Sequence, residues 1–79
     1  MTTEEAIEKV IAAGRGMHDG YAKIGKPAGP YPEDRAEQIA IGLYAIGRFL
    51  VGAHARPDAD IAAQIVRAEI MAGRLPTVH

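Results

Sequence analysis

The feature that most constrains the fold is the stretch of residues 39–53, IAIGLYAIGRFLVGA, which is almost entirely apolar and has Arg48 as its only charge. Helical spacing gathers its large apolar side chains into two lines. The first line consists of Ile39, Leu43, Ile46 and Leu50. The second, roughly on the other side, consists of Ile41, Tyr44, Arg48 and Val51. A surface helix of a small domain needs only one apolar stripe, so this helix is expected to offer its second line to something else.

Three destinations are open for the second line. It is covered by the other helices of the same chain, by a second copy in a homodimer, or by a foreign protein. A mixture of apolar, aromatic and Arg side chains is typical of interface hot spots. We therefore predict a partner-binding surface made of Ile41, Tyr44, Arg48 and Val51. Gly42, Gly47 and Gly52 favour close helix contact in each case.

Start and stop signals divide the rest of the chain into helices. Thr2 followed by Glu5 fits a capping box at the start of a helix. Three prolines and two glycines within residues 25–32 exclude helix there. Pro57 ends the long apolar helix, Asp58 is expected to cap the start of the next helix, and Gly73 fits the end of that last helix. The predicted helices cover about residues 3–24, 33–55 and 59–72, joined first by the Pro/Gly connector 25–32, in one domain over residues 1–79.

The predicted fold is all-α: a small antiparallel three-helix unit with the long apolar helix at its centre, which can complete its core by dimerising. Glycines at 14, 16 and 20 each weaken the first helix, and a break near Gly14 and Gly16 is the alternative to one continuous helix. If the helix is continuous, Gly14 lies in the middle of its apolar face. Another helix could then approach it closely.

In the third helix, the apolar face is expected to consist of Ile61, Ile65, Val66 and Ile70. Glu69 lies near the centre of this face, and a buried carboxylate is costly unless it is paired. The candidate partners of Glu69 are Arg48, His18, His54 and Tyr21, and the sequence does not choose between them.

Composition argues against several classes of function. There is no Cys or Ser to act as a nucleophile, and the three His residues have no metal-ligand spacing. We therefore expect no catalytic residues, no metal and no cofactor, and a protein that is not an enzyme. The net charge of −1 gives no strong field for tracking phosphates.

Nucleic-acid binding is the alternative reading of the third helix. In this reading the protein is a small nucleic-acid-binding regulator, and the basic side of the helix uses Arg56, Gln64, Arg67 and Arg74. Asp58 and Asp60 stand at the N-terminal end, where a groove-reading helix normally meets bases and phosphates. We therefore expect a protein partner rather than nucleic acid.

The expected function is that of a small non-enzymatic protein acting by protein–protein interaction and steric occlusion. The absence of Ser, Asn, Cys and Trp, together with frequent Ala, Gly and Arg, indicates a GC-rich bacterial or phage genome. A bacterial or phage inhibitor or accessory protein, for example of the anti-CRISPR type that binds a host multi-subunit complex, fits these observations. The apolar run is shorter than the ~20 residues that span a bilayer, so we expect no membrane insertion. The absence of Cys fits a reducing compartment, so we expect a cytoplasmic location.

Overall fold

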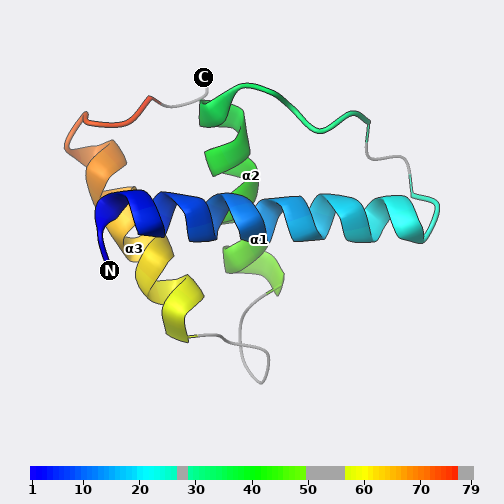
Figure 1. Cartoon of the computed structure of the whole chain (residues 1–79), viewed down its shortest axis with the longest axis horizontal. Coiled ribbons are helices and arrows are strands. Elements are labelled where there is room, and N and C mark those ends of the chain that lie inside the picture. Colours follow the sequence, from blue (N-terminus) through cyan, green and yellow to red (C-terminus); the bar gives the residue numbers. More distant parts are fainter. Residues whose placement is uncertain (27–28, 50–56, 77–79) are drawn as a thin grey trace.

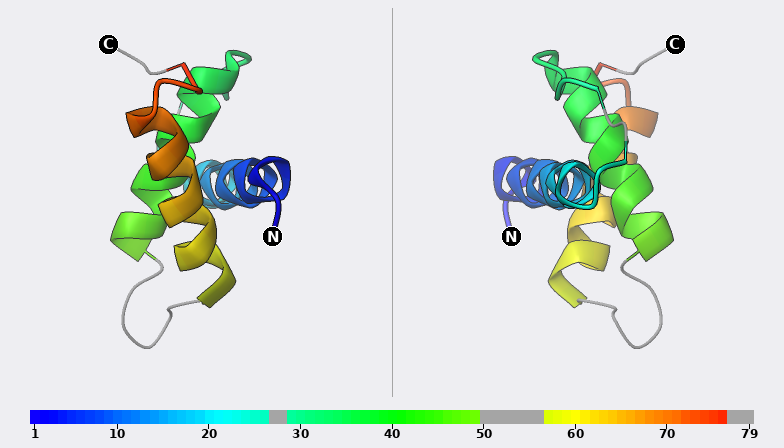
Figure 2. Two further views of the ribbon diagram at one scale, coloured as in Figure 1. Left: turned by 90° about the vertical axis from the view of Figure 1, so that its left-hand side faces the viewer. Right: turned by 90° about the vertical axis from the view of Figure 1, so that its right-hand side faces the viewer.

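The computed structural model describes residues 1–26, 29–49 and 57–76, which form three α-helices and no strand. The helices are α1 (Thr3–Lys23), α2 (Arg35–Phe49) and α3 (Pro57–Met71). α2 and α3 lie beside each other and run in opposite directions, and α1 crosses both of them on one side (Figures 1 and 2). The expected small all-α three-helix unit is confirmed, but only α2 and α3 are antiparallel, because α1 crosses them (Figure 1).

α1 begins and continues as the sequence predicts. The Oγ1 atom of Thr2 accepts a hydrogen bond from the backbone N–H of Glu5 at 3.1 Å, which caps the first turn. The helix then runs without interruption through Gly14 and Gly16. The alternative of a break at these glycines is therefore wrong.

α1 and α3 both end at a glycine in the left-handed region. Gly25 follows α1 with φ 77°, and Gly73 follows α3 with φ 75°. After α3, the backbone N–H of Arg74 donates to the carbonyl of Glu69 at 2.9 Å, as in a Schellman motif. The prediction that Gly73 ends the third helix is confirmed.

The start of α2 differs from the predicted position by about two residues. The carboxylate of Asp34 accepts a hydrogen bond from the N–H of Glu37 at 3.1 Å, so Asp34 caps the helix and Arg35 is its first residue. The side-chain amide of Gln38 donates to the carbonyl of Pro32 at 2.9 Å and holds the incoming chain. Capping by Asp34 therefore decides the boundary, and Pro32 stays outside the helix.

The second and third helices are shifted relative to their predicted ranges. The predicted helix over 33–55 is seen as Arg35–Phe49, and its expected last turns lie outside the described residues. α3 begins at Pro57 rather than at residue 59. Proline suits the first position of a helix, because its missing N–H would have no helical acceptor there. Asp58 therefore lies in the first turn and is not the cap that the sequence predicted.

Two glycines let α1 and α2 meet backbone to backbone. A Cβ atom added to Gly14 would lie 2.7 Å from the backbone nitrogen of Gly42. One added to Gly42 would lie 2.1 Å from the carbonyl oxygen of Val10. Neither position has room for a side chain, so the close approach expected at Gly14 is seen, with Gly42 as its partner. Figure 1 shows α2 passing behind α1 at this crossing.

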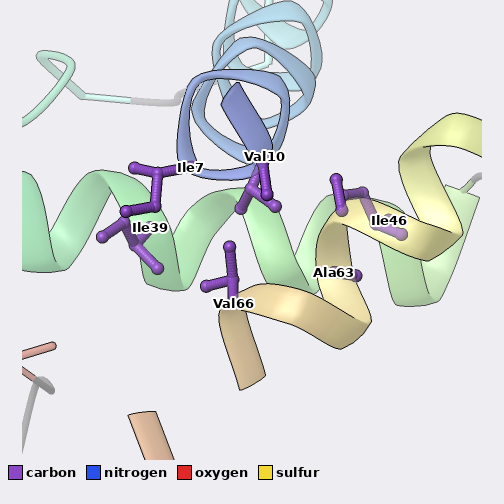
Figure 3. Close-up of a cluster of buried hydrophobic side chains, with 8 residues drawn as sticks. Ile7, Val10, Ile39, Ile46, Ala63 and Val66 are labelled. Carbon is purple, nitrogen blue, oxygen red and sulfur yellow. The ribbon is translucent and has the colours of Figure 1, made fainter. Parts of the chain in front are cut away.

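The core lies where α1 crosses the other two helices. Figure 3 shows Ile7 of α1 against Ile39 of α2, and Val10 of α1 facing Val66 of α3. All of these side chains are buried. Within the described residues α1 packs against both α2 and α3, which touch each other less. The central helix is therefore α1 and not, as expected, the long apolar helix.

The inward face of α3 is made of smaller side chains than the sequence suggested. Ala62, Ala63 and Val66 are fully buried, whereas Ile61 is 47% exposed. Because alanine side chains are small, they allow the α3 backbone to lie close to α1, and the side of α3 that carries them is the side that faces the core. The predicted apolar face is therefore wrong for Ile61. Ile65 and Ile70 pack at the margin of the core.

Candidate functional site

The second line of the apolar helix is the candidate site, and the structure describes three of its four predicted residues. Tyr44 is 55% exposed, Arg48 is exposed and Ile41 is half-buried. Val51 lies outside the described residues. The first line points the other way, since Ile39 and Ile46 are buried in the core.

The glycine crossing explains why this side of α2 faces outward. Gly42 lies against α1, and each residue advances about 100° around a helix. Tyr44 is therefore turned by about 200° from the contact with α1. Because the backbones touch at Gly42, the direction in which Tyr44 points is fixed by main-chain packing rather than by flexible side chains.

One residue of this surface was missed by sequence reasoning. Glu37 is exposed in the first turn of α2, on the same side of the helix as Tyr44 and Arg48. It precedes Ile41 by four residues and so continues the spacing of the line toward the N-terminus. We call Glu37, Ile41, Tyr44 and Arg48 the outer stripe. The helical spacing places Glu37 on this line, but the line was defined from its apolar side chains and Glu37 was therefore left out.

The outer stripe carries opposite charges at its two ends. Glu37 stands at the N-terminal end of α2, and Arg48 stands in its last turn. Within residues 1–26, 29–49 and 57–76, neither side chain forms an ion pair in this chain. Ile41 and Tyr44 lie between these charges, so the stripe has an apolar and aromatic centre with a charge on each side.

The residues of the alternative nucleic-acid surface are partly engaged within the chain. Gln64 donates to the Oδ2 atom of Asp60 at 3.2 Å. Arg74 donates to both carboxylate oxygens of Glu69, at 2.7 and 3.1 Å. Arg67 is exposed, and Arg56 lies outside the described residues. Of the described members, Gln64 and Arg74 thus bind carboxylates of the same chain, although the side chain of Arg74 remains 65% exposed.

The ion pair with Arg74 also answers the question of what accompanies Glu69. Arg74 was not among the four predicted partners: the chain turns at Gly73 and brings the guanidinium of Arg74 back over α3. Of those four, His54 lies outside the described residues. The carboxyl of Glu69 is half-buried rather than central to the core. Its pKa is lowered chiefly by the hydrogen bond from Arg74; desolvation opposes this effect, and the charge of the guanidinium adds a smaller lowering.

A second polar cluster holds the connector against α1. The Nε2 atom of His18 lies 2.8 Å from the carbonyl oxygen of Gly29, so this nitrogen carries the donated hydrogen. The ring of Tyr31 packs edge-on against His18, with centroids 5.4 Å apart, and the guanidinium of Arg15 lies 4.5 Å from the centroid of Tyr31. His18 is therefore a packing residue that fastens the connector.

The described ranges contain no group of three or more His, Cys, Asp or Glu residues arranged to hold a metal ion. None of the described helices is both long enough and apolar enough to cross a bilayer. Comparison of the chain with protein families, with characterised proteins and with solved structures found no match.

Proposed function

We propose that this chain is a non-enzymatic binding protein that acts by covering a surface of another protein with the outer stripe of α2. The observation that carries the proposal is Tyr44, an aromatic side chain 55% exposed beside Arg48 on a helix whose other side is packed against α1. Tyr and Arg, with Trp, are the residue types enriched at the energetic centres of protein interfaces.

The way α2 is mounted supports the same proposal. The contact between Gly14 and Gly42 joins the helix backbones directly, so the outer stripe is presented on a rigid element. A rigid surface loses little conformational entropy when it binds. Steric occlusion requires no chemical group beyond such a surface. The form we propose is a small bacterial or phage inhibitor that occupies a working surface of a host multi-subunit complex in the cytoplasm.

The test is a quantitative capture from bacterial lysate with the tagged chain and two variants of the outer stripe. We expect Tyr44→Ala and Arg48→Glu to lose the captured protein, because loss of an interface anchor typically costs about 2 kcal/mol or more, or roughly thirtyfold in affinity. Lys9→Glu is the matched control. Lys9 is an exposed cation on α1, and its reversal should leave capture unchanged.

The same material separates protein binding from nucleic-acid binding. Binding through phosphates weakens steeply as salt rises, whereas binding through a largely apolar stripe changes little. We expect the captured complex to survive a rise from low to moderate salt. If Arg67→Glu abolished a DNA affinity and Arg48→Glu had no effect on any binding, the proposed function would be wrong.

A further inference from the structure

We propose that the outer stripe also recognises a second copy of this chain, and that two α2 helices pair antiparallel about a two-fold axis. The inference rests on the proposed function only in using the same surface. It is carried by the order of residues along the stripe, which is self-complementary when one helix is turned end for end against another.

The residue positions place two kinds of contact about a single axis. The midpoint between Ile41 and Tyr44 is also the midpoint between Glu37 and Arg48. In an antiparallel pair centred there, Tyr44 faces Ile41 of the second copy, and Glu37 faces Arg48 of the second copy. Each contact occurs twice, as an isologous interface requires. The spacing of four, three and four residues is that of a helix–helix seam.

Charge selects the antiparallel arrangement over the parallel one. With α2 helices parallel and in register, Glu37 would face Glu37 and Arg48 would face Arg48, which is repulsive at both ends. Turned end for end, both ends become attractive, and the helix dipoles are also opposed. Among the described residues, Glu37 and Arg48 form no ion pair within their own chain, so the pairing breaks none.

The apolar centre of the seam fits the same arrangement. Tyr44 is largely exposed in the single chain, and Ile41 beside it is half-buried. In the dimer, the Tyr44 ring of each copy would pack on Ile41 of the other, so both residues would be covered in both copies. A single pair of helices buries less than the ~1,600 Å² of a standard interface, so we expect a reversible dimer whose population rises with concentration.

The test is sedimentation equilibrium over a wide range of concentrations, with charge-reversed variants. We expect Arg48→Glu and Glu37→Arg each to weaken self-association by about tenfold or more, because each creates two like-charge contacts in the dimer. An equimolar mixture of the two variants should associate again. In the mixed dimer one chain carries two arginines and the other two glutamates, so both ends are attractive.

A control variant and a measurement of helix content accompany the self-association experiment. Lys9→Glu should associate like the wild type, and circular dichroism should show the same helix content for all variants. A wild type that is monomeric at every concentration, or variants that fail to associate when mixed, would overturn the inference. Stripe-dependent capture from lysate would still support the proposed function in that case. A dimer without any captured protein would support the inference and count against the proposed function.

Discussion

At the scale of single residues, the molecule depends on two positions that have no side chain. Gly14 and Gly42 bring two helix backbones into contact, and the atoms that an added methyl group would meet are main-chain atoms. Backbone cannot move aside as the end of a flexible side chain can. The two glycines therefore fix the distance between α1 and α2, and with it the direction of the outer stripe.

This contact predicts opposite effects for two neighbouring glycines of α1. Gly14→Ala should lower the free energy of unfolding by about 1–3 kcal/mol, because the Cβ would lie 2.7 Å from the backbone of Gly42. Gly16→Ala should raise it by up to about 1 kcal/mol, because alanine favours helix and nothing lies within 4 Å of its Cβ. Urea unfolding followed by circular dichroism measures both. Equal effects at the two positions would contradict the crossing.

The ion pair of Glu69 and Arg74 predicts a dependence of stability on pH. Because the folded pKa of Glu69 lies below its ordinary value of 4.5, the pair stabilises the fold above that pH. The contribution is lost as pH falls through the lowered, folded pKa. Arg74→Ala should therefore be less stable than the wild type at neutral pH and equally stable in strong acid.

Thermal unfolding from acid to neutral pH measures this difference, with Lys23→Ala as the control for loss of an exposed cation. In the control, the difference from the wild type should not change as Glu69 titrates. A constant difference between Arg74→Ala and the wild type over the whole range would show that the pair does not exist in solution.

At the scale of elements, α1 has two unlike halves. Its buried residues, Ala6, Ile7, Val10 and Gly14, all lie before its middle or close to it. The second half extends beyond α2 and α3, and the connector returns along it (Figure 1). What fastens this half is the cluster of His18 and Tyr31 rather than the core.

Hydrogen exchange should therefore distinguish the two halves of one continuous helix. Backbone amides of residues 10–14 are expected to exchange only by global unfolding, because both faces of the contact are close-packed there. Amides of residues 19–23 should exchange faster by local opening of the projecting end. Exchange measured residue by residue by nuclear magnetic resonance tests this, and uniform protection along α1 would be the contrary result.

Elements also show how far sequence reasoning reaches. Caps and glycine stops depend on residues a few positions apart, so Thr2 and Gly73 were identified correctly from the sequence. The cap at Asp34 was missed because three prolines nearby offered a stronger apparent signal. The partner of Glu69 was missed because the predicted partners all precede the third helix in the sequence. Arg74 instead follows the end of the helix that carries Glu69 and folds back to it.

At the scale of the whole molecule, the three-helix architecture could be predicted, but the identity of the central helix could not. The apolar content of residues 39–53 suggested that this helix would be surrounded. In the structure α1 is the central helix, because both α2 and α3 pack against it. The contact with α2 depends on Gly14 lying against Gly42, and the sequence does not show which glycines of the two helices are in contact. The outer stripe was predicted because helical spacing alone separates it from the buried line. Glu37 fits the same spacing, but it was missed because a carboxylate was not counted with the apolar side chains of the line.

The direct contact between the backbones of two helices restricts how the sequence of this protein can evolve. Contacts between side chains drift, since a larger residue on one surface can be matched by a smaller one opposite. Gly14 and Gly42 offer no such exchange, because glycine is already the smallest residue on both sides. Any descendant that keeps this architecture should keep both glycines together, and a distant cousin could be recognised by that pair after the rest of its sequence has diverged.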